Sequence, residues 1–296
     1  MLKEKGPLLL ACNHPNSFLD AVLIDALFEQ PVYSLARGDV FKKPFYIKLL
    51  TALKILPVYR VSEGVENLSE NYKTFDACLA IFKTNGIVQI FSEGKCINEW
   101  HLRQLKKGTA RLSLAAWEQN IPLRILPVGT NYSSFRKFGK NVFINFGEII
   151  KRDNIDMNKS DGARHLIFNN LLEQQLKQLV FEIDQNDLEK QKHLLEIKLS
   201  PVRKVLLFLP AIIGFVFHAP LYLPLKSFTW KRTKDNDHYD SVLTALLLVT
   251  YPIYLLLIVI VTFLFIKNWF VVLLLPALPF TAWSYVQLKP QIGNQD

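Results

Sequence analysis

Apolar runs of strand length alternate with amphipathic stretches along the first half of the chain. The apolar runs are bounded by Gly, Pro or polar residues and cover residues 8–12, 31–36, 55–60, 87–91, 123–128 and 142–147. The stretches between them carry apolar residues at helical spacing, over 21–28, 41–54, 65–82 and 106–119. Strands that alternate with helices indicate an α/β fold. We therefore predict a layered, mixed and largely parallel sheet flanked by helices within residues 1–155.

Two of the amphipathic stretches support more specific predictions. In 65–82 the apolar residues recur at alternating intervals of three and four, and we expect them to form a core-facing side of a long helix: Val65, Leu68, Tyr72, Phe75, Leu79 and Phe82. In 41–54, lysines and aromatic residues alternate along a predicted helix. That pattern fits an element resting on a membrane surface, and it fits equally an ordinary surface helix with solvated lysines.

The second half of the chain has a different pattern. Residues 156–204 are highly charged at helical spacing, and we expect a connecting helical segment there. Three long apolar runs follow, at 205–225, 242–266 and 269–288. The run 242–266 holds 25 residues without a charge, which is long enough to cross a bilayer. A buried soluble helical subdomain is hard to reconcile with that run, so we predict a hydrophobic membrane segment over 205–290.

Loop charges predict the topology of this segment. Four cations lie between the first and second runs, at Lys226, Lys231, Arg232 and Lys234, whereas Lys267 alone separates the second run from the third. The positive-inside rule places the loop 226–240 in the cytoplasm. We therefore expect the proline-containing first run to be re-entrant or interfacial and the last two runs to form a hairpin; three full spans are the alternative. The N-terminal domain would face the cytoplasm at the cell (inner) membrane, and residues 1–5 give no sign of a signal peptide.

Charge narrows the class of partner. The chain of 296 residues is half hydrophobic and carries a net charge of +9. A basic surplus suits nucleic acid, anionic lipids or a phosphate-bearing substrate. The sequence contains neither zinc-finger spacing nor an RNP-type motif, and its apolar runs favour a membrane. We therefore expect membrane lipids as partners and no nucleic acid.

The three cysteines, Cys12, Cys78 and Cys96, are widely spaced and form no C-x-x-C motif. This spacing argues for a reducing compartment and against a disulfide framework or a metal site. Cys12 lies two residues before His14, so a thiol nucleophile is one alternative. Its position in an apolar strand favours instead a small buried hydrophobic residue.

The most informative polar segment runs from Asn13 to Asp20, between the first apolar run and the first amphipathic stretch. His14 follows the strand at its carboxyl end, where α/β sheets place their ligand sites. We expect a helix to begin near Ser17, with Asp20 one turn inside it and able to reach back to the imidazole. A carboxylate that orients a histidine makes a general base. The alternative is structural, because Ser17 and Asp20 also match the S-x-x-D capping box.

Other charged residues follow later strands. Arg60 ends the third apolar run, and Glu93, Gly94 and Lys95 come soon after the fourth. Because the carboxyl ends of parallel strands meet at one edge of a sheet, we expect these residues to lie at the same edge as His14.

Taken in order, these segments resemble the family of PlsC-like glycerolipid acyltransferases, which contains 1-acylglycerol-3-phosphate and glycerol-3-phosphate acyltransferases. Its first motif, N-H-x-x-x-x-D, is matched by Asn13, His14 and Asp20. The remaining three motifs are matched, in the same order, by residues 57–60, 91–95 and 126–128. The resemblance covers roughly residues 7–150. Four motifs in order are far more specific than any one of them.

The sequence departs from the family pattern in two motifs. Five residues separate His14 from Asp20, where the family usually has four. One added residue turns a helical position by about 100°, which moves the carboxylate unless the turn absorbs it. In the third motif, Ser92 replaces the usual Pro, and Lys95 and Cys96 stand where a hydroxyl residue and an Arg are common.

The resemblance implies a membrane-bound O-acyltransferase of phospholipid synthesis. His14 would take the proton from an acceptor hydroxyl, which attacks the thioester of acyl-CoA or acyl carrier protein. Asp20 would orient His14 and stabilise its charge. The acceptor would be glycerol-3-phosphate or its 1-acyl derivative, and no cofactor is expected beyond the acyl donor. A non-phosphorylated lipid acceptor is one alternative, and a non-catalytic membrane scaffold with a lost dyad is another.

The resemblance also implies a phosphate site. Arg60, assisted by Lys95, would bind the acceptor phosphate, and Gly94 would let the backbone approach closely. Glu93 would bind acceptor hydroxyls or orient Arg60. The structural alternatives are a surface arginine and an ordinary salt bridge. Two further cations are candidates to supplement the site, Lys107 and Arg111.

Overall fold

The computed structural model describes residues 2–41, 43–59, 68–290 and 292. The chain divides into two compact units. The first unit consists of Met1–Pro15, Asp20–Asn131 and Phe143–Glu182, and the second of Asn16–Leu19, Tyr132–Val142 and Ile183–Asp296.

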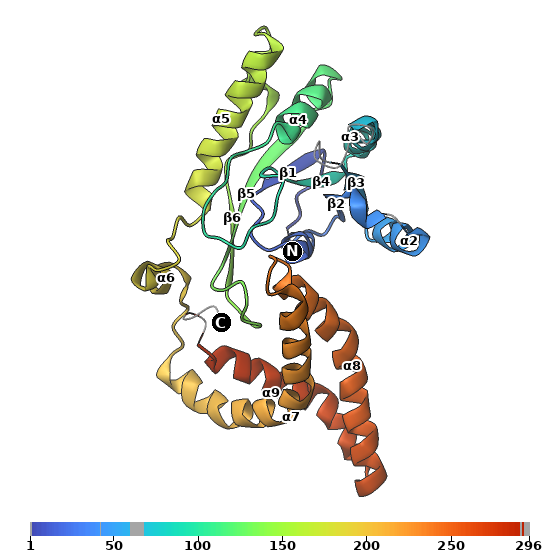
Figure 1. Cartoon of the computed structure of the whole chain (residues 1–296), viewed down its shortest axis with the longest axis vertical. Coiled ribbons are helices and arrows are strands. Elements are labelled where there is room, and N and C mark those ends of the chain that lie inside the picture. Colours follow the sequence, from blue (N-terminus) through green and yellow to red (C-terminus); the bar gives the residue numbers. More distant parts are fainter. Residues whose placement is uncertain (1, 42, 60–67, 291, 293–296) are drawn as a thin grey trace. The chain divides into compact units, whose positions relative to one another are not determined.

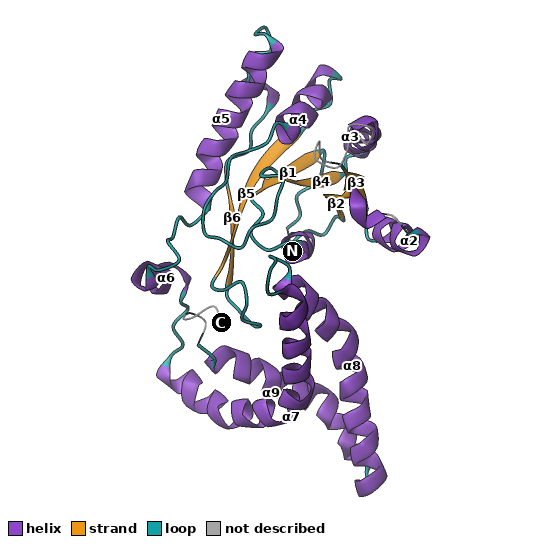
Figure 2. Cartoon of the chain, viewed as in Figure 1, coloured by secondary structure: helices purple, strands orange, loops and turns teal. Residues whose placement is uncertain are grey.

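Six strands form one sheet (Figure 2). They are β1 (Leu8–Cys12), β2 (Val32–Arg37), β3 (Ile55–Val58), β4 (Ile87–Phe91), β5 (Arg124–Tyr132) and β6 (Val142–Phe146). Their order is β3-β2-β4-β1-β5-β6, and the first five strands pair in parallel. Gly147 donates to the Pro127 carbonyl and Ser133 to that of Asn141, so β6 runs antiparallel to β5. The predicted α/β fold with a mostly parallel sheet is confirmed.

Helices flank this sheet in the first unit (Figure 1). They are α1 (Phe18–Asp25), η1 (Gly38–Phe41), α2 (Pro44–Ala52), α3 (Leu68–Lys83), α4 (Gly108–Glu118), η4 (Arg152–Asn154) and α5 (Asp161–Leu179). The strand β1 shows how the two faces are filled. Leu9 and Ala11 join a core that α3, α4 and α5 cover, whereas Leu8 and Leu10 join a second core that includes Ile24 of α1. An apolar run buried on both faces is typical of a central parallel strand.

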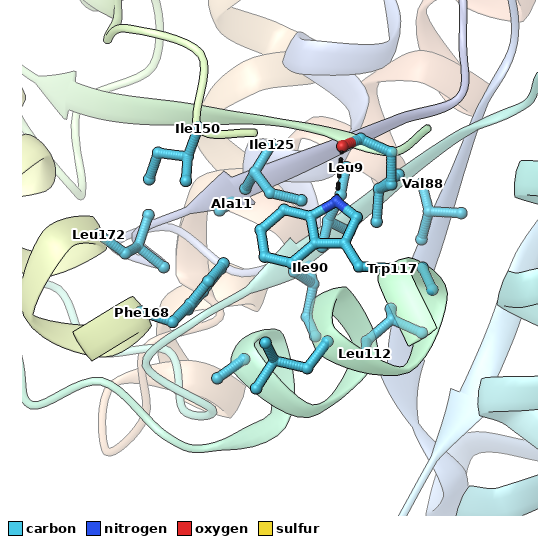
Figure 3. Packing of buried hydrophobic residues seen from close by; sticks show 14 of the residues in the cluster. Leu9, Ala11, Val88, Ile90, Leu112, Trp117, Ile125, Ile150, Phe168 and Leu172 are labelled. Atoms are coloured by element: carbon cyan, nitrogen blue, oxygen red, sulfur yellow. Dashed lines mark hydrogen bonds between the residues drawn. The ribbon is translucent and has the colours of Figure 1, made fainter. Parts of the chain in front are cut away.

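Trp117 of α4 lies at the centre of the larger core (Figure 3). Its indole N–H donates to the Leu123 carbonyl at 2.9 Å, and its ring meets Phe168 of α5 edge-on with centroids 6.0 Å apart. The aromatic ring and its satisfied polar atom thus tie α4, the start of β5 and α5 together.

The predicted core face of 65–82 is only partly correct. Leu79 and Phe82 are buried, but Tyr72 is 74% exposed. Two residues after Tyr72, Thr74 is buried and its hydroxyl donates to the Pro57 carbonyl at 2.6 Å. Val65 and the side chain of Leu68 lie outside the described part of the chain.

The second unit contains α6 (Leu188–Leu195), α7 (Pro201–Thr233), α8 (Tyr239–Ile266), η5 (Trp269–Leu273) and α9 (Leu274–Leu288). By length and composition, three segments can cross a membrane: Pro201–Thr233, Tyr239–Ile266 and Trp269–Leu288. The expected re-entrant run 205–225 is part of one continuous helix of 33 residues. The ribbon of α7 changes direction along its length (Figure 1), and its internal prolines Pro220 and Pro224 are a physical reason for a bend.

Replacement of Trp117 tests the description of the core. Trp117→Ala empties the space between α4 and α5 and leaves the Leu123 carbonyl without its donor, so we expect a stability loss of about 3–5 kcal/mol. Thermal unfolding of the full chain in detergent, followed by circular dichroism, measures it. Tyr72→Ala is the matched control, because the loss of an exposed ring changes stability by only about 0.5 kcal/mol. Equal shifts for the two variants would contradict this packing.

Candidate active site

The carboxyl ends of β1, β4 and β5 meet at one edge of the sheet. Cys12 pairs with Phe91 on one side and with Val128 on the other. Beyond the last ladder pair, the Asn13 amide continues the connection to β5: its Nδ2 donates to the Thr130 carbonyl at 3.1 Å, and its Oδ1 accepts from the Thr130 N–H at 2.8 Å. The position from which His14 leaves the sheet is therefore fixed by side-chain as well as backbone bonds.

His14 and Asp20 are in contact. His14 Nδ1 lies 2.9 Å from Asp20 Oδ2; the carboxylate is fully buried and the imidazole side chain is 16% exposed. The ring stacks on Phe91 with centroids 3.8 Å apart and planes inclined by 15°. Because Nδ1 faces Asp20, Nε2 is the ring nitrogen left to exchange a proton with a substrate. The carboxylate would stabilise the imidazolium that results.

The extra residue between His14 and Asp20 is absorbed before the helix begins. Ser17 has a φ of 53°, in the left-handed region that non-glycine residues seldom adopt, and α1 begins directly after it at Phe18. Asp20 therefore keeps its place in the first turn of α1. The turn accommodates the longer spacing at Ser17, so the contact with His14 survives the departure from the family motif.

Glu93 binds the backbone of His14. Its Oε2 accepts from the His14 N–H at 2.8 Å and its Oε1 from the Arg103 N–H at 2.9 Å. Burial raises the pKa of the Glu93 carboxyl, and the two backbone N–H groups oppose this rise. Each carboxylate oxygen thus accepts from a backbone N–H, which holds His14 from the main-chain side. The expected role of Glu93 toward acceptor hydroxyls or Arg60 stays a prediction, because Arg60 lies outside the described residues.

The turn after β4 has a tight backbone. The Ser92 N–H donates to the Cys12 carbonyl at 2.8 Å, a bond that the proline usual in the family cannot form. Gly94 has a φ of +68°, and a Cβ on it would lie 3.1 Å from Lys106 Cγ. A larger residue at 94 would therefore meet both backbone strain and crowding.

The predicted cations Lys95, Lys107 and Arg111 are all exposed. Lys107 directly precedes α4 and Arg111 lies one turn inside it. The start of α4 is fixed beside the 92–94 turn, because Lys106 N–H donates to the Ser92 carbonyl at 2.7 Å and Thr109 Oγ1 to Ser92 Oγ at 3.0 Å. Lys107 and Arg111 thus lie at a helix N-terminus, which itself favours anions. Arg60 lies outside the described residues.

Some residues of this edge were not predicted. Asn13 belongs to the first motif but had no role assigned, and a polar residue directly after a buried strand was its signal. Lys106 was also not predicted, although it is, like its neighbour Lys107, a cation at the start of a predicted helix. Asn98 donates from Nδ2 to the Pro15 carbonyl at 2.7 Å, and no local sequence pattern marks it.

Cys12 is disfavoured as a thiol nucleophile. Burial, together with the nearby Asp20, raises the pKa of the Cys12 thiol, so the reactive thiolate form is disfavoured. Within the part of the chain that the structure describes, no three His, Cys, Asp or Glu side chains are grouped so that they can hold a metal ion.

The family comparison agrees with this geometry. Residues 1–131 match the model of the family described as Acyltransferase, the PlsC-like glycerolipid acyltransferases. The chain carries an acyltransferase domain. The match contains His14, Asp20, Glu93 and the cations at the start of α4, and the resemblance drawn from the four motifs is confirmed. The protein is therefore an acyltransferase enzyme. No curated protein matches the chain.

Substitution of Glu93 tests its part in the acyltransferase site. In Glu93→Gln one oxygen becomes an NH₂ group that faces a backbone N–H, so one buried donor loses its acceptor. We expect kcat to fall by about tenfold or more, since an error on the order of 1 Å in a catalytic group can cost 10²-fold. Steady-state acyl transfer measures it, with the folded fraction checked by circular dichroism. An unchanged kcat would show that Glu93 does not position His14.

Proposed function

We propose that this acyltransferase moves a fatty acyl group from acyl-CoA or acyl carrier protein to the hydroxyl of glycerol-3-phosphate or 1-acylglycerol-3-phosphate in phospholipid biosynthesis. The observation that carries the proposal is the 2.9 Å contact between His14 and a fully buried Asp20 at the carboxyl edge of the sheet. Exposed cations at the start of α4 and three helices of membrane-spanning length support a lipid substrate with a phosphate group.

The proposed chemistry needs one base and no covalent enzyme intermediate. His14 Nε2 takes the proton from the acceptor hydroxyl as its oxygen attacks the thioester carbonyl. The new C–O bond forms, the C–S bond breaks, and the proton passes from His14 to the leaving thiolate. Asp20 holds the imidazole through Nδ1 and stabilises its positive charge while the proton resides there. The thioester supplies the activation, so no cofactor beyond the donor is proposed.

The acceptor phosphate is assigned to the cations of the same edge. Lys107 and Arg111 follow one another by a helical turn at the start of α4, and Lys95 belongs to the turn after β4. Arg60 is proposed from its motif to complete the set. A guanidinium can bind a phosphate through two parallel hydrogen bonds, whereas a lysine provides a point charge. Gly94 is proposed to let the acceptor approach the backbone.

Membrane lipids are the proposed partners of the enzyme surface. All residues of α2 are exposed or half-exposed, among them Phe45 at 71%, and lysines flank these apolar side chains. Apolar rings beside cations suit an anionic lipid surface. The expected 226–240 loop is shorter in the structure, because α7 continues to Thr233. The cations Lys226, Lys231 and Arg232, near the end of α7, and Lys234 directly after it support a cell (inner) membrane location with this end of α7 and the catalytic domain on the cytoplasmic side.

A non-phosphorylated lipid acceptor remains an alternative, whereas the non-catalytic scaffold loses its basis. Lys95 replaces the hydroxyl residue common in the family, which favours a non-phosphorylated lipid acceptor as the second candidate. The scaffold alternative rested on a broken dyad, and His14 and Asp20 are in contact.

Removal of the imidazole tests the base. General acid–base groups contribute about 10²–10⁴-fold, so His14→Ala is expected to lower kcat/KM by that factor for every acceptor. The assay follows labelled acyl-CoA with glycerol-3-phosphate or 1-acylglycerol-3-phosphate, using detergent-purified full-length protein. His193→Ala is the control, because His193 is an exposed histidine on α6. Wild-type turnover that survives in His14→Ala would contradict the assignment.

Replacement of Arg111 tests the phosphate site. Arg111→Ala is expected to raise the acceptor KM about tenfold, the equivalent of one charge-assisted hydrogen bond, with kcat little changed. Arg152→Ala is the matched control. Arg152 is exposed and follows Ile150, whose backbone pairs with Ile125 at the opposite end of β5. A rise in the KM of acyl-CoA alone would assign the cation to the donor instead.

A further inference from the structure

Four residues inside the first motif belong to the second unit. Asn16–Leu19 form part of that unit, whereas Pro15 before them and Asp20 after them belong to the first. These four residues, together with Pro15, are the covalent link between the base and the carboxylate that orients it. What holds them therefore bears on the geometry of the site.

Asn16 is held at both its side chain and its backbone. Its Nδ2 donates to Asp240 Oδ2 at 2.8 Å, and its carbonyl accepts from Ser241 Oγ at 3.2 Å. Asn16 and Asp240 are both buried, and both hydrogen-bond partners come from the first turn of α8. Because the contacts link residues more than two hundred positions apart in sequence, they are a product of the tertiary fold.

The same turn of α8 caps the helix that carries Asp20. The Leu19 N–H, in the first turn of α1, donates to Ser241 Oγ at 3.2 Å. The first N–H groups of a helix lack an intrahelical acceptor and are often capped by the side-chain oxygen of a Ser, Thr, Asp or Asn. Ser17, at the position expected for that cap, has a left-handed backbone, and its hydroxyl lies 2.9 Å from His238 Nδ1. Ser241 supplies the Leu19 N–H with an acceptor from a distant part of the sequence.

Asp240 is itself fixed by a cation. Lys140, from the segment that joins β5 to β6, forms an ion pair with Asp240 Oδ2, the oxygen that also accepts from Asn16. Both side chains of the pair are buried. A buried carboxylate with two donors on one oxygen is a rigid acceptor, well suited to set the position of a neighbouring loop.

We propose that Asp240 and Ser241, in the first turn of the membrane-type helix α8, are positioning residues for acyl transfer. They fix Asn16–Leu19 and through this link the relative placement of His14 and Asp20. That Asp240 and Ser241 hold Asn16–Leu19 rests on the hydrogen bonds alone. That this affects acyl transfer rests on the proposed function. The consequence is that the catalytic motif depends on the apolar C-terminal half of the chain, although the family match ends at residue 131.

Ser241 variants test the two parts separately. Ser241→Ala removes the acceptor for Leu19 and the donor to Asn16, whereas Ser241→Thr keeps a hydroxyl. Thr250→Ala is the matched control, because it removes from the same helix a hydroxyl that bonds only within it, to the Leu246 carbonyl at 2.7 Å. Hydrogen-exchange mass spectrometry measures the rate of amide exchange in the peptide that contains Asn16–Leu19. Steady-state kinetics measure kcat and the KM values of donor and acceptor. Both experiments use the full chain in detergent.

The proposal predicts faster exchange of that peptide in Ser241→Ala alone. It also predicts a fall in kcat of about 10–100-fold, with both KM values within about threefold, because a misplaced base lowers turnover rather than binding. Ser241→Thr should recover most of both signals. Unchanged exchange in Ser241→Ala overturns the structural part. Faster exchange with wild-type kcat overturns the positioning role. A wild type that is inert with every donor and acceptor overturns the proposed function, while the exchange result still decides the structural part.

Swapping the side chains of residues 16 and 240 gives an independent test. Asn16→Asp sets two carboxylates against each other, and Asp240→Asn leaves Lys140 without its buried partner charge. The double variant restores an amide–carboxylate hydrogen bond and keeps a carboxylate near Lys140. We expect each single variant to lose at least tenfold in kcat and the double variant to recover most of the loss, as a double-mutant cycle detects. Additive losses in the double variant would contradict direct coupling between residues 16 and 240.

Discussion

The hydrogen bond from the His14 backbone N–H to the buried Glu93 carboxylate joins the ends of two parallel strands. On the other side, the Asn13 amide binds the backbone of β5 at Thr130. The residue that carries the imidazole is thus held from both neighbouring strands before its side chain makes any contact. Stacking on Phe91 and the bond to Asp20 then orient the ring. A base held in this way needs little reorganisation when it accepts a proton.

The longer first motif illustrates how the fold compensates for a departure from a family pattern. The added residue is confined to a left-handed turn at Ser17, so α1 starts where it must for Asp20 to meet His14. The turn and the start of α1 have hydrogen-bond partners in the first turn of α8, through Asp240 and Ser241. An acyltransferase that acts on lipids would in this way tie its catalytic motif to the same helices that suit a membrane. Chemistry and membrane attachment would be properties of one chain rather than of two independent parts.

Much of the fold followed from local pattern, because buried strands read as short apolar runs. The run 87–91 coincides with β4, and the edge of the sheet that carries His14 followed from the parallel arrangement. The hydrogen-bond partners of Glu93 could not be predicted from the sequence, because they are backbone N–H groups and every non-proline residue has one. The left-handed Ser17 was equally hidden, because serine at that position reads as a helix cap. Contacts such as Asn16 with Asp240 depend on residues brought together by the whole fold, and the periodicity of 65–82 gave no sign that Tyr72 is exposed.

The central claim is that His14 Nε2 removes the proton from an acceptor hydroxyl while cations of the same edge hold the phosphate. A structure of the full chain with glycerol-3-phosphate and a non-reactive acyl-CoA analogue tests it most directly. The account predicts an acceptor hydroxyl oxygen within about 2.6–3.2 Å of His14 Nε2 and the phosphate against Arg111 or Lys107. An acceptor bound with its hydroxyls away from His14, or with its phosphate at a different surface, would contradict the account.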